Sequence, residues 1–457
     1  MELYSIYKSL PYQVQNILCS MYGYYIGFQR YGRQYEDIFV QLLSSDNWNE
    51  SKILGYKEEN LFRVIEYSYK HCPFYKKKFT EAGVTPSTFT GMSSLQLFPI
   101  LTKEDVRNNY QGMISDEYSV KDMIHYHTSG TTGKALDFYW TRHNLQYYWA
   151  TVWRGRSRFD VHRGDPHLNF TGKNVVPINV SSSPYWRYNK AQNQYLINMQ
   201  HISKNKVQYI VDFINDSDLS FITGYPSIVN SLAELMSEER LQVNKSPGFF
   251  FSSAEKLYEY QKSAIEKTFH GLKVIEHYGF SENAAAASMC DCGHYHEDFE
   301  LGHLELINSV DTDEGTMGNM VATGFQNLGM PFIRYEIGDV ATFTDSVCQC
   351  GRSSQVITNI EGRTEDYILT PEGTRIMRLD YIFKGTYSIK ESQIVQKKDG
   401  RLLLRIVRRQ DYTTKVEDDI RMTIKSMISP TIGVDFEYID EIERTKSGKF
   451  KAVVSEL

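Results

Sequence analysis

The chain has 457 residues, of which 41% are hydrophobic and 23% charged, a composition typical of globular proteins with a large core. Its net charge of −6 argues against a broad phosphate-backbone interface, so we expect no nucleic-acid partner. No stretch approaches the roughly 18 apolar residues that cross a bilayer, and MELYSIYKSL lacks the features of a secretory signal. We therefore expect a cytoplasmic protein without a membrane span.

The first 100 residues are predicted to be largely helical. Residues 61–79 repeat apolar side chains at three- and four-residue spacing, as in a half-buried helix. Thr102 stands before Glu104 and Asp105, a combination that favours a helix start.

Residues 120–345 alternate between short apolar runs and helical stretches. Apolar runs at 220–225 and 248–254 each lead into a helical pattern, and 273–279 is a third strand-like run. Repetition of strand, turn and helix predicts an α/β fold with parallel strand pairing.

The pattern changes after residue 363. Residues 366–376 resemble a hairpin turning at 371–373, 401–409 and 434–440 read as strands, and 416–428 as a helix. We therefore predict a large N-terminal domain, residues 1–365, and a small α+β C-terminal lid, residues 366–457.

One loop combines hydroxyls, glycines and a cation. It consists of Thr128, Ser129, Gly130, Thr131, Thr132, Gly133 and Lys134. Converging backbone N–H groups of such a loop can bind anions. Only two residues separate Gly130 from Gly133-Lys134, so it is not a Walker A loop. Taken alone, it is more often a hairpin turn than a nucleotide site.

Further segments follow that loop in a fixed order. They are SSAEKL (252–257), EHYGFSE (276–282), RYEIGD (334–339), EGRTEDYIL (361–369) and RTKSGKFK (444–451). In this order they resemble the core motifs of the acyl-adenylate-forming superfamily, along the whole chain. Residues 7–32 and 184–194, with His201, resemble the CapK-type branch, which groups with phenylacetate–CoA ligases and often occurs with capsule biosynthesis.

The resemblance implies a role for each matching residue. Thr128–Lys134 would surround the β- and γ-phosphates of ATP. The other nucleotide-binding residues would be Ser253, Ala254, Glu255, Tyr278, Gly279, Asp339 and Arg363. Glu282 would bind Mg²⁺, Asp366 would be the hinge of the lid, and Lys449 the mobile catalytic lysine.

The chemistry requires these residue types. A carboxylate attacking the α-phosphate brings two anions together, and Mg²⁺ with the Lys449 ammonium can offset the developing charge. Asp339 would hold the ribose in line for displacement. Glu336 and Ile337 depart from the Thr-Gly-Asp ending of many superfamily members, which leaves the acid substrate open.

Three outcomes remain open at this stage. In the first, the acyl group passes to coenzyme A or a carrier-protein thiol; in the second, it passes to an amine such as an amino sugar. A third alternative is a non-catalytic nucleotide-binding assembly protein, against which Lys449, Glu282 and Asp339 argue. Thioester formation follows from resemblance alone.

Four of the six cysteines form two C-x-C pairs at 290/292 and 348/350. Clustered cysteines in a reducing compartment favour metal binding over disulfides. We predict a structural zinc site made of Cys290, His296, Cys348 and Cys350, with Cys292 or His294 as substitutes. The alternative is that these are unliganded thiols on loops.

Overall fold

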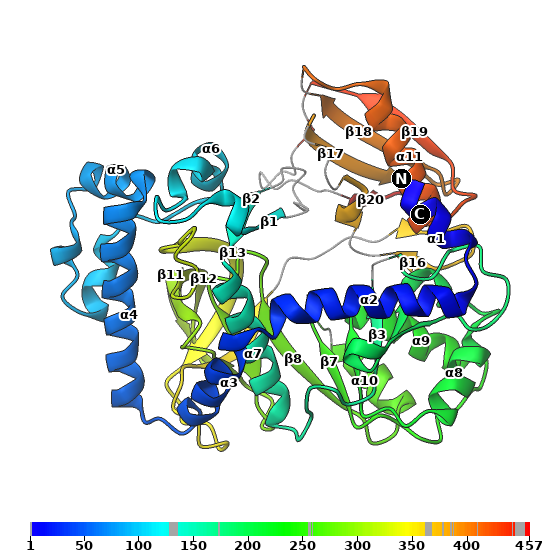
Figure 1. Cartoon of the computed structure of the whole chain (residues 1–457), viewed down its shortest axis with the longest axis horizontal. Coiled ribbons are helices and arrows are strands. Elements are labelled where there is room, and N and C mark those ends of the chain that lie inside the picture. The colour runs from blue at the N-terminus through cyan, green and yellow to red at the C-terminus, as the bar shows by residue number, and fades with distance from the viewer. Residues whose placement is uncertain are drawn as a thin grey trace.

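The computed structural model describes residues 2–127, 136–171, 174–254, 257, 259–361, 368–376, 379–383, 386, 388–408, 410–440, 442–443 and 453–457 (Figure 1). The N-terminal part is helical, as predicted. Its helices are α1 (Glu2–Ser9), α2 (Tyr12–Arg30), α3 (Arg33–Ser45), α4 (Glu50–His71), α5 (Pro73–Glu81) and α6 (Lys103–Met113). Short 3-10 turns are η1 (Pro86–Thr88), η2 (Met92–Leu97), η3 (Val120–Asp122), η4 (Lys190–Gln192), η5 (Met199–His201) and η6 (Leu379–Phe383).

The single helix predicted over 61–79 is wrong, because the chain breaks there into α4 and α5. Pro73 has no N–H and disfavours a helical conformation in the preceding residue. Cys72 accordingly takes φ −118° and ψ 106°. The start predicted for α6 is confirmed: the Thr102 side chain accepts from the Asp105 N–H, and the Asp105 carboxylate accepts from the Thr102 N–H.

Twelve strands of the described residues form one large sheet, ordered β11-β12-β13-β14-β10-β9-β8-β7-β6-β3-β5-β4. They are β3 (His167–Thr171), β4 (Arg187–Asn189), β5 (Gln194–Asn198), β6 (Phe221–Gly224), β7 (Phe249–Ser252), β8 (Lys273–Gly279), β9 (Ala286–Met289), β10 (Tyr295–Glu297), β11 (Gly302–Thr312), β12 (Gly315–Gly324), β13 (Tyr335–Thr344) and β14 (Val356–Glu361). Strands β5, β3, β6, β7 and β8 pair in parallel, as predicted. Beyond β8 the pairing is antiparallel. β8 is therefore where the two halves of the sheet meet.

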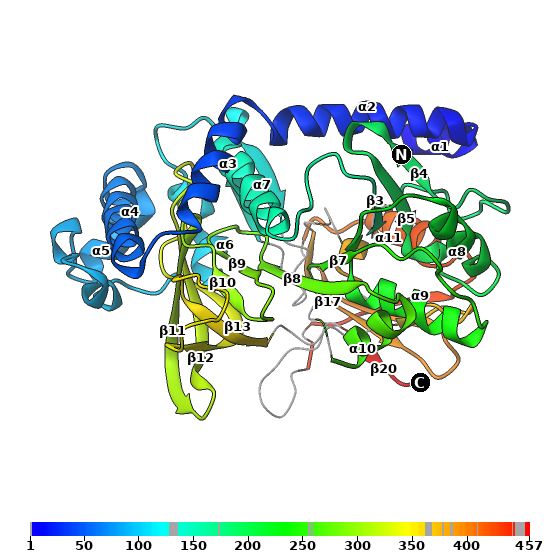
Figure 2. The same cartoon turned by 90° about the horizontal axis from the view of Figure 1, so that it is seen from below.

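Alternate residues of the parallel strands pack on opposite faces, because successive side chains of a strand point to opposite sides. Phe221 and Phe251 join the core cluster that contains residues of α7 (Arg142–Ser157). Ile222 and Phe250 join the cluster that contains α8 (Val207–Asp216), α9 (Pro226–Glu238) and α10 (Glu259–Thr268). Figure 2 shows α7 and α10 on opposite sides of β8. A separate hairpin pairs β1 (Ile124–His127) with β2 (Asp137–Trp140).

The C-terminal part is a small α+β unit, as predicted. Its elements are β15 (Ile368–Leu369), β16 (Arg375–Ile376), β17 (Ile389–Gln396), β18 (Leu402–Arg408), α11 (Thr414–Met427), β19 (Val434–Tyr438) and β20 (Val453–Ser455). β15 and β16 form the expected hairpin, and four strands form a sheet ordered β19-β18-β17-β20. The proposed boundary between residues 365 and 366 lies outside the described residues.

Candidate active site and metal centre

The candidate active site lies at the carboxyl edge of the parallel strands, where β8 adjoins the antiparallel half. Gly224, Ser252 and Glu276 are in register across β6, β7 and β8. The segments that follow β6 and β7 therefore leave the sheet side by side, and β8 continues beyond them to Gly279. In open α/β sheets, ligands bind outside this edge at a point where the strand order switches.

Two tyrosine–carboxylate pairs join β8, the β8–β9 connection and β13 at this edge. The Tyr278 hydroxyl of β8 donates to Asp339 Oδ2 of β13 at 2.8 Å. The Tyr335 hydroxyl at the start of β13 donates to Glu282 Oε1 at 2.5 Å. Glu282 lies in the β8–β9 connection and is only 6% exposed. Predicted residues from separate motifs thus converge.

The two carboxylates share an environment that disfavours their charge. Burial raises the pKa of Glu282, the hydrogen bond from Tyr335 opposes that rise, and the charge of Asp339 adds to it. Burial likewise raises the pKa of Asp339, and the Tyr278 hydrogen bond opposes it. Two neighbouring carboxylates with this tendency are suited to receive a cation or hydroxyl donors.

Unusual backbone conformations accompany the site. Gly224 has φ +145°, and a Cβ there would lie 2.5 Å from the Phe170 carbonyl oxygen. Ala254 has φ +69° and Asn283 has φ +54°, and such values cost a non-glycine residue about 1–3 kcal/mol. The Asn283 side chain is held by a 3.0 Å hydrogen bond to Asn144 of α7. The chain is thus held in strained conformations beside β6, β7 and β8.

The predicted nucleotide residues fall into two groups. Ser253 and Ala254 directly follow β7, and Gly279 ends β8, so these lie at the same edge as Tyr278. The others lie outside the described residues: Thr128–Lys134, Glu255, Arg363, Asp366 and Lys449. Sequence analysis missed Tyr335. The available signal was its hydroxyl in RYEIGD, on the strand that carries Asp339.

A second cluster gathers the predicted metal ligands at the other end of β8. Because β9 runs antiparallel to β8 with His277 opposite Ser288, the chain reaches Cys290 on the side away from Gly279. Cys290 and His296 come from the β9–β10 hairpin, and Cys348 and Cys350 from the β13–β14 connection. The cluster therefore joins two loops of the antiparallel half.

The four side chains fit a zinc ion. Their ligand atoms all lie within 4.8 Å of one another. Cys290 Sγ lies 3.7 Å from Cys348 Sγ, and Cys350 Sγ lies 3.2 Å from His296 Nε2. Tetrahedral zinc with Zn–S of about 2.3 Å and Zn–N of about 2.0 Å separates such pairs by roughly 3.8 and 3.5 Å, whereas a disulfide needs about 2.0 Å.

The environment favours this set over its substitutes. Cys292 is exposed and lies outside the four-ligand group, whereas Cys290 and His296 are buried. His294 Nδ1 lies 3.6 Å from Cys348 Sγ and remains a neighbour. Burial lowers the pKa of His296 to about 4, and the nearby arginines add to this effect. A neutral imidazole is the form that binds metals.

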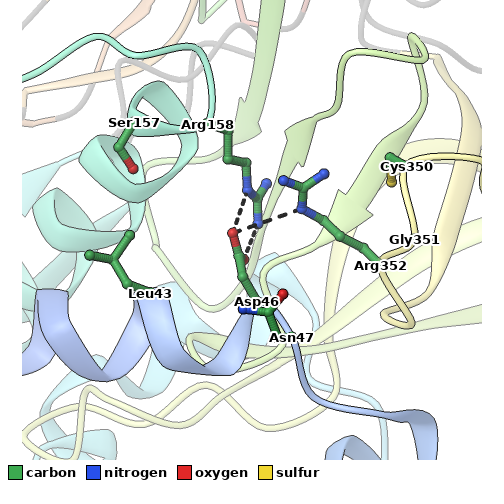
Figure 3. A pocket seen from close by; sticks show the side chains of 8 residues that line it. All are labelled: Leu43, Asp46, Asn47, Ser157, Arg158, Cys350, Gly351 and Arg352. Atoms are coloured by element: carbon green, nitrogen blue, oxygen red, sulfur yellow. Dashed lines mark hydrogen bonds and ion pairs between the residues drawn. The ribbon is translucent and has the colours of Figure 1, made fainter.

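An arginine network that sequence analysis missed packs beside the metal cluster. The Arg154 side chain, 1% exposed, pairs with Asp46, Asp298 and Glu300 at 2.8–3.0 Å. Figure 3 shows Arg158 and Arg352 directed toward Asp46, at 2.6 and 3.8 Å. A surface pocket of about 270 Å³ is lined by Leu43, Asp46, Asn47, Ser157, Arg158, Cys350, Gly351 and Arg352. Asp46 is shared by all three guanidinium groups, so the network joins α3, α7 and the cysteine loop.

No helix among the described residues has the length and hydropathy of a membrane span.

The chain is similar in sequence to protein CapK and to phenylacetate-coenzyme A ligases. Residues 368–456 match the family model described as CapK C-terminal domain. Protein CapK of Staphylococcus aureus is 22% identical over 99% of both chains. The phenylacetate-coenzyme A ligase of Thermus thermophilus is 26% identical over 70% of this chain and 72% of its own. That of Escherichia coli K12 is 22% identical over 67% and 70%.

The fold also matches a solved structure. A 2-hydroxyisobutyryl-CoA ligase, in complex with its acyl-AMP and CoA, superposes with a TM-score of 0.58. The match covers 90% of this chain and 92% of that one at 18% identity. At this identity the match establishes the shared fold.

Proposed function

The chain belongs to the CapK and phenylacetate–CoA ligase branch of the adenylate-forming ligases, and on that premise we propose the following reaction. A carboxylic acid attacks the α-phosphate of ATP, giving an acyl-adenylate and pyrophosphate. The acyl group then passes to coenzyme A or a carrier-protein thiol, which releases AMP.

The observation that carries this proposal is the convergence of Tyr278–Asp339 and Tyr335–Glu282 at the carboxyl edge of β8. Asp339 would accept hydrogen bonds from the ribose hydroxyls, and Tyr278 fixes the position of its carboxylate. Glu282 would hold Mg²⁺, whose charge would lower the cost of bringing two anions together. Tyr335 would keep Glu282 ionised despite its burial.

The remaining roles rest on the sequence motifs. Thr128–Lys134 would bind the departing pyrophosphate, Glu255 and Arg363 would contact the nucleotide, and Lys449 would stabilise the negative charge of the transition state. Rotation about Asp366 would withdraw Lys449 after the first step and admit the acceptor. Ser253, Ala254 and Gly279 would border the adenine, because they follow β7 and end β8.

A thiol acceptor is favoured because the phenylacetate relatives are named as coenzyme A ligases. Amide ligation to an amino sugar would require the same first step and differs only in the acceptor. We place the reaction in the cytosol, where ATP is available, and in surface-polysaccharide biosynthesis, following the CapK relationship.

We further propose that Cys290, His296, Cys348 and Cys350 hold a structural zinc ion. Four protein ligands leave no open position for water, so such an ion stabilises the fold without entering the reaction. It would cross-link the β9–β10 hairpin to the β13–β14 connection and thereby support β13, which carries Asp339.

The test is a pyrophosphate–ATP exchange screen across carboxylic acids, followed by product analysis with coenzyme A or amines. Acid-dependent exchange that is lost in Lys449→Ala supports adenylation. A full set of acids that gives no exchange would refute it and leave the non-catalytic alternative. AMP release that requires coenzyme A supports the thiol acceptor, whereas release that requires an amine overturns that part of the proposal.

A further inference from the structure

Two arginines near the candidate active site have no acidic partner among the residues that the structure describes. Arg30 ends α2, and Arg156 lies in the last turn of α7. Within the described part of the chain, neither forms an ion pair. Arg154, only two residues from Arg156, has three carboxylates around it. Arg154 and Arg156 are thus both cationic residues of α7, but in the described structure only Arg154 has carboxylates beside it.

Aromatic rings contact both guanidinium groups, one ring at Arg30 and three at Arg156. Arg30 Cζ lies 3.9 Å from the centre of the Trp149 ring, and Arg156 Cζ lies 4.7 Å from that of Trp153. Phe221 and Phe251 lie 5.4 and 5.3 Å from Arg156. Cation–π contacts return about 0.5–2 kcal/mol, which is less than the cost of burying a charge without a partner.

The lack of a nearby carboxylate among the described residues also lets burial lower the pKa values of the two guanidinium groups. Burial lowers the pKa of Arg156 to about 10, and the charge of Arg30 lowers it further. Burial also lowers the pKa of Arg30. The charge of Arg30 thus acts on Arg156, and two cations in an environment of low polarity attract an anion.

The pair lies next to the strands that form the active-site edge. Phe221 and Phe251 belong to β6 and β7, on the face that α7 covers. Tyr148 of α7 packs 6.2 Å from the His277 ring, and His277 precedes Tyr278 on β8. An acid whose reacting carboxylate reached the nucleotide could extend from this edge along the aromatic side chains of α7.

We propose that Arg30 and Arg156 recognise a second anionic group on the acid that is activated. This rests on the proposed adenylation and narrows its substrate class to acids that carry a carboxylate or a phosphoryl group at the end remote from the reacting carboxylate. The aromatic rings would contact the body of such an acid.

The experiment compares matched acids in pyrophosphate–ATP exchange. Phenylacetate is compared with 4-carboxyphenylacetate, and butyrate with glutarate and with 3-phosphonopropionate. We expect the doubly anionic acid of at least one pair to have the higher kcat/KM. Whether the dicarboxylate or the phosphonate has the higher kcat/KM then shows which anionic group is recognised. Arg156→Met and Arg30→Met should raise KM for that acid by about 10-fold or more, with KM for ATP unchanged.

Three results would overturn this inference. Preference for the neutral acids would assign the arginines to packing. An equal rise of KM for ATP in the variants would assign them to the phosphates. Arg156→Lys keeps the positive charge. If this variant is inactive with both the neutral and the doubly anionic acids and its melting temperature falls sharply, the role of Arg156 is structural only. Absence of exchange with every acid would instead refute the adenylation on which the inference rests.

A separate observation concerns the outer face of α2, which is apolar and exposed. The helix crosses the front of the molecule in Figure 1 and lies along its upper edge in Figure 2. Met21 is 62% exposed and Phe28 71%. Exposed apolar side chains recur at three- and four-residue spacing as Val14, Ile17, Met21, Tyr24 and Phe28, flanked by Leu18, Tyr22 and Tyr25. This spacing is that of a helix–helix seam.

The inward face of α2 is the polar one. Gln15 Oε1 accepts from Arg187 Nε at 2.6 Å, and Asn16 Oδ1 accepts from the Tyr188 N–H at 3.0 Å. Gly23 packs so closely on Asn189 that a Cβ would lie 2.1 Å from its Oδ1. Specific contacts therefore fix the orientation of α2, and its apolar side is the outer one.

We infer that this face binds the same face of a second copy of the chain. Aromatic side chains offer about 150–250 Å² each, so the exposed parts add up to roughly 800 Å², the area each partner contributes to a standard interface. Residues 12–29 carry no charge, so two antiparallel copies meet without repulsion. Membrane-binding helices carry Lys and Arg on their polar face, whereas β4 occupies that face here.

Sedimentation of the full chain between about 0.1 and 50 µM tests this interface. We expect a dimer that Ile17→Glu with Met21→Glu and Phe28→Glu converts to a monomer with an unchanged melting temperature, while Val40→Glu on α3 leaves the dimer intact. A wild-type monomer at every concentration, or a dimer that survives the triple change, refutes the interface. Flotation of the wild type with phosphatidylcholine–phosphatidylserine vesicles would assign the face to lipid instead.

Discussion

Tyr335→Phe removes the hydroxyl that donates to Glu282 at 2.5 Å and keeps the buried ring. A hydrogen bond to a charged acceptor contributes about 1.5–3 kcal/mol. Because burial and the charge of Asp339 already raise the pKa of Glu282, losing this donor raises it further. The carboxylate should then be protonated over more of the working pH range.

The assay is pyrophosphate–ATP exchange measured from about pH 5.5 to 9. At 1.36 kcal/mol per pH unit, the midpoint of the acidic limb should move upward by about one to two pH units in Tyr335→Phe, with activity recovering at high pH. Higher Mg²⁺ should move it back, because a bound cation favours the ionised form.

Tyr67→Phe is the matched control, since it removes a hydroxyl bonded to Ser115 at 2.7 Å, away from the site. Its acidic limb should coincide with that of the wild type. An acidic limb that is unchanged in Tyr335→Phe would refute the role assigned to Glu282. A uniform loss of activity at every pH would also contradict the reasoning, since it would indicate disturbed packing.

Burial raises the pKa of Glu282, so its ionisation destabilises the folded state as pH rises through that pKa. Glu282→Gln should abolish exchange. Its melting temperature should exceed that of the ligand-free wild type by a margin that grows as pH increases. Asp339→Asn should raise KM for ATP by about 10- to 100-fold in exchange kinetics, whereas Glu336→Gln should not. Cys348→Ser should lose zinc by elemental analysis and lower the melting temperature, while Cys292→Ser, outside the ligand group, should match the wild type. Arg154→Met leaves Asp298 and Glu300 buried without their partner and should cost about 3–5 kcal/mol in urea unfolding. Arg163→Met breaks the exposed ion pair with Glu36 and should cost less than about 1 kcal/mol.

The sequence predicted elements with a strong local signal. The strands β6, β7 and β8 are short apolar runs next to helical patterns, and their parallel pairing follows from that alternation. The start of α6 follows from Thr102 and its capping partner. The break at Pro73 was missed because apolar periodicity continues across it, although proline chemistry forbids a continuous helix.

The site was predictable only in part, because its contacts join distant segments. Asp339 and Glu282 were found through motifs, but their tyrosine partners follow from strand register, which periodicity does not determine. The candidate metal ligands could be picked out because thiols and imidazoles are rare and clustered. Arg154 and its carboxylates could not be paired from sequence, since one charge among many carries no sign of burial.

The attachment of α2 also has a consequence for synthesis on the ribosome. Gln15 bonds to Arg187, 172 residues later in the chain. At about 5–20 residues per second, roughly 10–30 s pass between translation of the helix and of the strand that receives it. During that interval the polar face of α2 lacks its β4 partner, so the helix is not yet held in its final orientation and can bind chaperones or neighbouring nascent chains. Slow translation before residue 187 should therefore increase aggregation more than slow translation after it.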